Sequence, residues 1–185
     1  MAHTVLAGHR PLARRCRAGA RDAERLLPDG DPMSIAVVDG TVEIRRSSED
    51  VFDYVTDISR EFEWNPRTKR VAKLTEGPIG VGTRWEGEWV EGDPMLIDYV
   101  AFDRPASWHS IGRSRGLLVA SDGRVEPTRN GARLTLRVEL EPRGRLRLIA
   151  PLLSRIMRGR ERQNLTAIKK RLECGAARAD GGGKR

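Results

Sequence analysis

The chain has 185 residues, a hydrophobic fraction of 38% and a formal net charge of +8. This length allows one domain with a sizeable core. The charge is concentrated in residues 143–173, which hold ten basic and two acidic residues, whereas residues 35–142 are slightly acidic. A nucleic-acid-binding surface usually interleaves aromatic residues with its basic ones, and residues 143–173 contain no aromatic residue. We therefore expect no nucleic-acid partner. A weak contact between the basic C-terminal helix and an anionic membrane stays open.

Composition divides the chain into three parts. Residues 1–34 and 174–185 are rich in Ala, Gly, Arg and Asp without sustained apolar periodicity, so both are predicted to be disordered. The predicted folded unit is residues 35–173. Translation from Met33, just before the first predicted strand, is an alternative to a start at Met1.

Cysteine usage and hydropathy bear on the compartment. Cys16 and Cys174 both lie in the predicted tails, which excludes a disulfide framework. No apolar run approaches the roughly 18 residues of a membrane span. We expect a cytoplasmic protein, a monomer or a homodimer, that holds no metal ion and no cofactor.

The first predicted elements are a strand and a helix. Residues 41–45 alternate between apolar and polar side chains, which indicates a strand. The sequence Ser47-Ser48-Glu49-Asp50 is typical of a helix N-terminus, where a serine oxygen accepts a backbone N–H and acids suit the helix dipole. The helix is predicted to continue brokenly through Phe62 and to stop before Pro66, since the residue before proline disfavours α geometry.

Six further strands follow, over residues 67–74, 83–91, 95–102, 107–113, 116–126 and 132–140. The alternation is clearest in the last of them, where alternate residues from Ala132 to Leu140 are apolar. The loop from Gly77 to Gly82 holds three glycines and predicts a turn with positive φ angles. Its spacing fits neither of the glycine-rich nucleotide signatures. Seven strands joined by short turns, with one helical insertion, predict an antiparallel meander.

A long helix is predicted to end the folded unit. It starts near Pro151, because proline suits a first helical turn, and ends at Glu173, with Gly175 as its C-terminal cap. Its apolar residues are predicted to form one stripe that anchors both ends of the helix to the sheet. These residues are Ile149, Leu152, Leu153, Ile156, Ala167, Ile168 and Leu172. The polar residues Arg160, Gln163 and Asn164 interrupt the stripe.

This order of elements, with four local stretches, resembles the SRPBCC (START-like) superfamily over residues 35–173, in its polyketide cyclase/dehydrase and lipid-transport branch. The stretches are Val55-Thr56-Asp57-Ile58 with Phe62-Glu63-Trp64-Asn65-Pro66, the glycine turn Gly77 to Trp85, Tyr99 to Pro105, and Leu165 to Glu173. The resemblance implies an α+β helix-grip fold. In it, a seven-stranded antiparallel sheet wraps around a long C-terminal helix, two short helices follow the first strand, and a hydrophobic cavity lies between sheet and helix.

Members of this superfamily bind lipids, sterols, polyketides, quinones or plant hormones, and a minority are enzymes. Tryptophans suit such a site, since each offers a large apolar ring and one N–H donor. The alternative for each ring is ordinary core packing. The polar residues of the helix are expected either to bind a polar ligand group or to mark where the helix leaves the sheet. The candidate ligand-binding residues are Trp64, Trp85, Trp89, Tyr99, Trp108, Met157, Arg160 and Asn164.

No catalytic residue is predicted. His109 is the only histidine of residues 35–173 and is expected at the surface or with its hydrogen bonds satisfied, while Asp98 is expected to face solvent rather than the cavity. We therefore expect a protein that binds a hydrophobic or amphipathic small molecule and is not an enzyme. Two alternatives stay open: a cyclase, aromatase or dehydratase, which would bring polar groups together deep in the cavity, and a membrane-associated lipid or quinone carrier.

Overall fold

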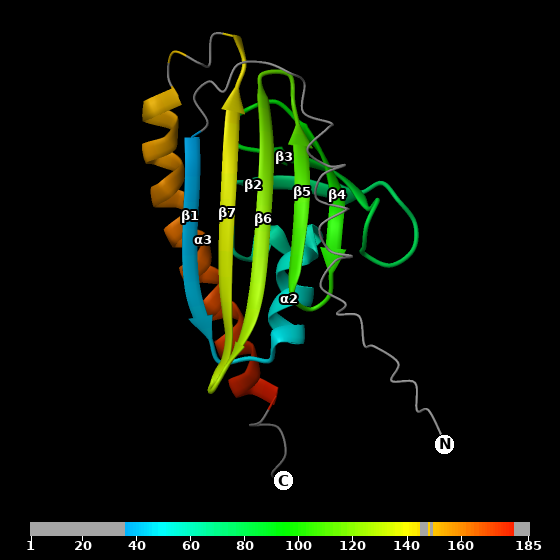
Figure 1. Cartoon of the computed structure of the whole chain (residues 1–185), viewed down its shortest axis with the longest axis vertical. Helices are drawn as coiled ribbons and strands as arrows, with labels where there is room; N and C mark the ends of the chain where they lie inside the picture. Colours follow the sequence, from blue (N-terminus) through cyan, green and yellow to red (C-terminus); the bar gives the residue numbers. More distant parts are fainter. Residues whose placement is uncertain (1–35, 145–147, 149, 180–185) are drawn as a thin grey trace, which may run out of the picture. The chain divides into compact units, whose positions relative to one another are not determined.

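The computed structural model describes residues 36–144, 148 and 150–179, all in one compact unit. It contains a seven-stranded antiparallel sheet with the strand order β1-β7-β6-β5-β4-β3-β2 (Figure 1). The strands are β1 (Ala36–Ile44), β2 (Thr68–Lys73), β3 (Arg84–Trp89), β4 (Met95–Asp103), β5 (Ser107–Arg113), β6 (Leu117–Thr128) and β7 (Gly131–Pro142). All seven predicted strands are confirmed, and β1 starts five residues earlier than predicted.

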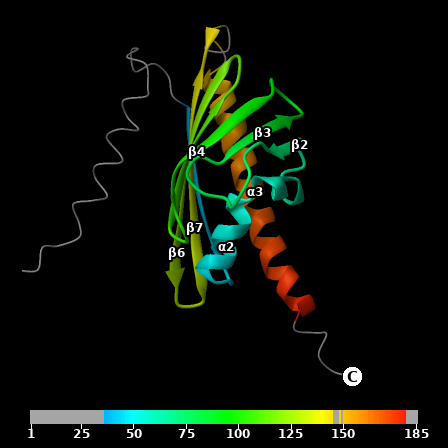
Figure 2. The ribbon, with the colours of Figure 1, turned by 90° about the vertical axis from the view of Figure 1, so that its right-hand side faces the viewer.

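The sheet is a meander with one crossover. From β2 to β7 each strand pairs with the next along the chain, and β1 pairs with β7 at the far edge. The helices α2 (Ser48–Thr56) and η2 (Ile58–Glu63, a 3₁₀ helix) span the crossover, which confirms the predicted broken helix. Figure 2 shows α2 and the C-terminal helix α3 (Ala150–Ala179) on the same side of the sheet.

The start of α2 follows the sequence prediction. The Ser47 hydroxyl accepts a hydrogen bond from the Asp50 backbone N–H at 3.1 Å, and two acids occupy the first turn. Val51, Phe52 and Val55 are buried on the face towards the sheet. Asp57 then ends α2 and accepts from the Ser59 N–H at 3.1 Å, which starts η2.

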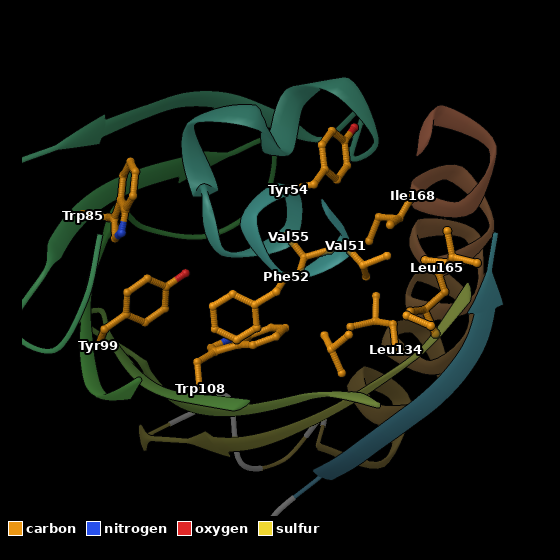
Figure 3. Close-up of a cluster of buried hydrophobic side chains, with 13 residues drawn as sticks. Val51, Phe52, Tyr54, Val55, Trp85, Tyr99, Trp108, Leu134, Leu165 and Ile168 are labelled. Carbon is orange, nitrogen blue, oxygen red and sulfur yellow. The ribbon is translucent and has the colours of Figure 1, made fainter. Parts of the chain in front are cut away.

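Aromatic rings fill the core between α2 and the sheet (Figure 3). Phe52 packs edge to face against Trp108, with ring centroids 5.5 Å apart, and against Phe102 at 5.0 Å. The Trp108 ring lies directly over Gly123, where any Cβ would overlap it. Glycine at position 123 therefore leaves room for the Trp108 ring on the inner face of the sheet.

Helix α3 packs against β1 through its C-terminal half. Leu165 and Ile168 are buried, and a Cβ on Gly40 of β1 would lie only 2.5 Å from a Leu165 methyl carbon. The helix runs to Ala179, so the predicted end at Glu173 is wrong by six residues, and Gly175 lies inside the helix instead of capping it.

The single apolar stripe predicted for α3 is also wrong. Leu152 and Ile156 are 59% and 42% exposed, whereas Ile168 is fully buried. At 100° per residue, the sixteen residues from Leu152 to Ile168 turn the helix by about 160°, which places the two side chains on opposite faces. The two apolar ends of the helix therefore do not share the sheet-facing side.

Candidate functional site

A buried carboxyl group, Glu61 of η2, lies under the strand β3. It is only 9% exposed and accepts hydrogen bonds from Trp89 Nε1 at 2.9 Å and Asn65 Nδ2 at 2.5 Å. Burial raises the pKa of this carboxyl group, and the hydrogen bonds from Trp89 and Asn65 oppose the rise. Trp89 is thus held by the protein itself, through its indole nitrogen.

A second enclosed carboxyl group, Glu161, projects from α3 towards the same interior. Its Cγ lies 3.8 Å from where a Cβ on Gly40 would stand. Desolvation and the nearby charge of Glu61 raise its pKa to about 7. Among the described residues, no hydrogen bond or ion pair engages this carboxylate. Glu161 is therefore a carboxyl group that can exchange a proton near neutral pH.

The three candidate residues on α3 lie around Glu161. Met157 and Asn164 are half-buried. The guanidinium of Arg160 lies 3.2 Å from the Glu91 carboxylate, in the turn after β3. This ion pair ties α3 to the β3–β4 turn. Whether any of the three residues contacts a ligand stays a prediction.

Three of the predicted aromatic residues belong to the core. Trp85 and Trp108 are buried, and the buried Tyr99 hydroxyl donates to the Thr56 carbonyl oxygen at 2.7 Å. Burial raises the pKa of Tyr99 far above its usual value, so this hydroxyl stays protonated. The Trp85 indole nitrogen is buried with no acceptor among the described residues. Such an unsatisfied donor costs about 1–3 kcal/mol, which a bound water or ligand acceptor would recover.

A large open hollow lies beside these groups, between α2, η2 and the C-terminal half of α3. Its volume is about 1390 Å³, and Phe102 and Ile79 bring β4 and the glycine loop into its wall. Of the predicted ligand-binding residues, only Trp64 lines it. Phe62, two residues before Trp64, is 67% exposed at the hollow. The hollow therefore presents apolar side chains to a molecule entering from solvent.

Charged groups share the wall with these apolar ones. Lys170 and Arg171 of α3 and Arg60 of η2 lie in it, and the Arg60 guanidinium stacks 4.6 Å from the centre of the Tyr54 ring. The Tyr54 hydroxyl donates to Glu63 at 3.1 Å. Burial, followed by the negative charge of Glu63, raises the pKa of Tyr54 to about 12. An amphipathic molecule would meet both kinds of contact here.

The outer face of the sheet holds the two titratable residues singled out in the sequence. His109 Nδ1 lies 2.8 Å from Asp122 on the neighbouring strand β6, so the histidine has a hydrogen-bond partner, as predicted. Asp98 pairs with Arg84 at 2.6 Å and with Arg113 at 3.2 Å, away from the core. Within the described ranges, no group of three His, Cys, Asp or Glu residues has metal-site geometry.

Glu61 and Glu161 are not among the site residues that the sequence predicts, although the spacing of each to nearby apolar residues indicates a shared helix face. Ile58 and Glu61 are three residues apart, and such residues share a face of a 3₁₀ helix. Glu161 lies four residues before the buried Leu165 and seven before Ile168, on the same face of α3. An acidic residue whose spacing places it on the same helix face as buried apolar residues therefore predicts a carboxyl group inside the protein.

The fold is similar to that of several solved structures. A START superfamily protein from Mycobacterium smegmatis has a TM-score of 0.64 at 15% identity, over 74% of this chain and 97% of its own. Ara h 8.0201 gives 0.58 at 15% identity, over 76% of this chain and 99% of its own. The di-domain ARO/CYC protein StfQ from the steffimycin biosynthetic pathway gives 0.62 at 14% identity, over 77% of this chain; the match spans about half of StfQ, 52%.

A curled antiparallel sheet that holds a C-terminal helix, shared with these structures, defines the helix-grip fold of START-like proteins. Residues 36–173 match one family model, so the chain belongs to the family "Polyketide cyclase / dehydrase and lipid transport". No curated protein sequence matches the chain. Among the described residues, no helix is both long and apolar enough to cross a membrane.

Proposed function

We propose that the chain binds a hydrophobic or amphipathic small molecule, such as a lipid, polyketide or quinone, against α3. The observation that carries this proposal is the hollow of about 1390 Å³ with Phe62, Trp64 and Phe102 in its wall. Small-molecule sites are usually about 300–1,000 Å³ and mostly apolar. The hollow has room for an extended ligand.

The charges in the wall favour a ligand with an acidic or strongly polar end. Lys170 is exposed at the hollow, and among the described residues no carboxylate forms an ion pair with it. Arg60 and Arg104 are paired with Glu63 and Asp53. A ligand anion could therefore pair with Lys170 without displacing a protein carboxylate.

A variant that fills the hollow tests this site. Ala167 of α3 lines the hollow, whereas the preceding residue, Thr166, is exposed and outside the lining. Binding of the fluorescent probe 1-anilinonaphthalene-8-sulfonate, which joins an apolar ring system to an anionic group, should weaken at least tenfold in Ala167→Phe and stay unchanged in Thr166→Phe. Equal probe affinity in both variants would refute the proposed site. Native mass spectrometry of protein purified from its own host should then show a co-purified molecule in the unmodified chain and none in Ala167→Phe.

A second candidate function is acid–base catalysis of the cyclase or dehydratase type. Its specific support is Glu161, whose pKa of about 7 suits a group that takes up and releases protons at neutral pH. In an aldol cyclisation of a poly-β-ketone, such a carboxylate would take a proton from the carbon between two carbonyl groups. That carbon would then bond to a third carbonyl carbon, whose oxygen would take the proton back from the carboxyl group. The resulting hydroxyl group would leave as water together with the second hydrogen of the attacking carbon, forming a carbon–carbon double bond.

The enzyme candidate is tested with a poly-β-ketone thioester analogue and absorbance detection of an aromatic product. Product should form with the unmodified chain and be at least 100-fold slower with Glu161→Gln, consistent with the usual contribution of a general base. Glu173→Gln, near the C-terminal end of the same helix and outside the lining of the hollow, is the matched control. Product formation that Glu161→Gln leaves unchanged would exclude Glu161 as the base. The predicted cytoplasmic location and the oligomeric state stay predictions.

A further inference from the structure

The outward face of the N-terminal half of α3 is apolar where a soluble helix is normally polar. Leu152 and Ile156 lie one turn apart and are 59% and 42% exposed, and Leu148, just before the helix, is 85% exposed. Glu161 follows Leu152 by nine residues, or two and a half turns, so the interior acid and the exposed leucine point in opposite directions. We call Leu148, Leu152 and Ile156 the outer ridge.

Positive charge is concentrated next to the outer ridge. From residue 142 to residue 160 the sequence contains six arginines and no acidic residue. Arg155, Arg158 and Arg162 are exposed on α3. In the described part of the chain no carboxylate forms an ion pair with these three, in contrast to Arg160, which is paired with Glu91. Nothing described on this face therefore neutralises the positive charge.

An apolar ridge with exposed arginines beside it matches the surface of an anionic bilayer. Amphipathic helices lie in the interface with their apolar side chains at the level of the headgroups and acyl chains. Each basic residue near an anionic leaflet contributes on the order of 1 kcal/mol, or about fivefold in affinity. An RNA-binding surface would instead be expected to offer aromatic rings for base stacking, and α3 carries none.

We infer that the N-terminal half of α3 docks the protein onto an anionic lipid bilayer, with the outer ridge at the headgroup level and Arg155, Arg158 and Arg162 on the lipid phosphates. This docking goes beyond ligand binding, because it uses the face of α3 opposite to its buried stripe. It places the protein on the membrane surface without crossing it.

Co-sedimentation with vesicles tests the inference. The full chain should bind vesicles that contain phosphatidylglycerol and phosphatidylcholine at least tenfold more tightly than vesicles of phosphatidylcholine alone. Raising the NaCl concentration should weaken binding, since salt screens exposed charges. Replacing all three arginines by glutamine should weaken binding to anionic vesicles about 100-fold, at about fivefold for each residue.

The outer ridge is tested separately from the charge. The double variant Leu152→Ser, Ile156→Ser should weaken binding to anionic vesicles about tenfold, because the lost apolar area no longer enters the bilayer. A matched control is Leu74→Ser, Val81→Ser, which changes two apolar side chains that are 50% and 68% exposed elsewhere on the molecule. This control should bind as tightly as the unmodified chain.

Two results would overturn the inference. The first is equal binding of the ridge variant and the control to anionic vesicles. The second is a combination of two observations: the unmodified chain does not bind vesicles, and sedimentation velocity shows it as a dimer whereas the ridge variant is a monomer. The outer ridge would then be a contact between two copies of the chain. Vesicles free of any added ligand are used, so failure here would leave the result of the fluorescent-probe experiment unaffected.

Discussion

Replacing Glu161 with glutamine should stabilise the folded chain at alkaline pH and change its stability little near pH 4. The folded-state pKa is raised to about 7 from its ordinary value of 4.5. A carboxyl group with a raised pKa leaves stability intact below its unfolded pKa and lowers the free energy of unfolding as pH rises through its folded pKa. Glutamine has the same shape and no charge, so it removes this loss.

The size of the effect follows from the shift. One pKa unit corresponds to about 1.4 kcal/mol, so the difference between 4.5 and about 7 corresponds to about 3 kcal/mol at full ionisation. Between pH 5 and pH 8.5 the stability advantage of Glu161→Gln should grow by about 2 to 3 kcal/mol. Urea unfolding of both proteins, followed by circular dichroism at the two pH values, measures this difference.

Glu173, on the same helix, provides a control of opposite sign. Hydrogen bonds from Lys169 and from the Arg45 backbone N–H lower the pKa of Glu173. Its contribution to stability is therefore present above its unfolded pKa and is lost as pH falls. Glu173→Gln should destabilise the chain at pH 8.5. If Glu161→Gln loses stability with rising pH as steeply as the unmodified chain, Glu161 is not an enclosed carboxylate and the reasoning is wrong.

Three further substitutions test the interior and α3 by urea unfolding. Glu61→Ala should cost about 1–3 kcal/mol because it removes the acceptor of the Trp89 N–H, whereas Glu61→Gln keeps an acceptor and should cost less; equal losses would contradict the hydrogen bond. Gly123→Ala should cost about 1–3 kcal/mol, since its Cβ would overlap the Trp108 ring, and a neutral result would mean that the ring can move. Gly159→Ala, with open space around an exposed helical position, should add up to about 1 kcal/mol, and destabilisation would show that the helix is interrupted there.

The sheet could be predicted because its physical causes are local. Alternation places every second side chain of a strand on one face, and the alternate apolar residues of β7 include the buried Ala132, Leu134 and Leu140. Glycine and proline turns then separate the strands. The register between strands is not local in this way. His109 lies opposite Asp122 because of the particular alignment in which β5 and β6 pair. Because this alignment cannot be derived from spacing along the chain, Asp122 could not be foreseen as the partner of His109.

The hollow could not be predicted, because it depends on how α2, η2 and α3 pack against one another. The sequence predicts Trp64 as a ligand-binding residue, and the structure places this residue in the wall of the hollow. Trp85 and Trp108 are predicted as ligand-binding residues for the same reason as Trp64, yet they pack in the core. A tryptophan marks a large apolar contact in either case, and only the neighbours of the ring decide between ligand and core.

The residues of helix α3 do not form the single apolar stripe that the sequence predicts, and the departure from that stripe is itself informative. In its N-terminal half the usual arrangement is inverted: the enclosed side carries Glu161, and the exposed side carries Leu152. This arrangement lowers the stability of the fold in two ways. The carboxyl group of Glu161 loses its hydration, and the apolar side chain of Leu152 stays exposed to water. Such a cost is expected where function requires those residues. The two proposals for α3 thus rest on opposite faces of one helix, and because Glu161 and Leu152 share no described contact, the effects of their substitutions should be independent.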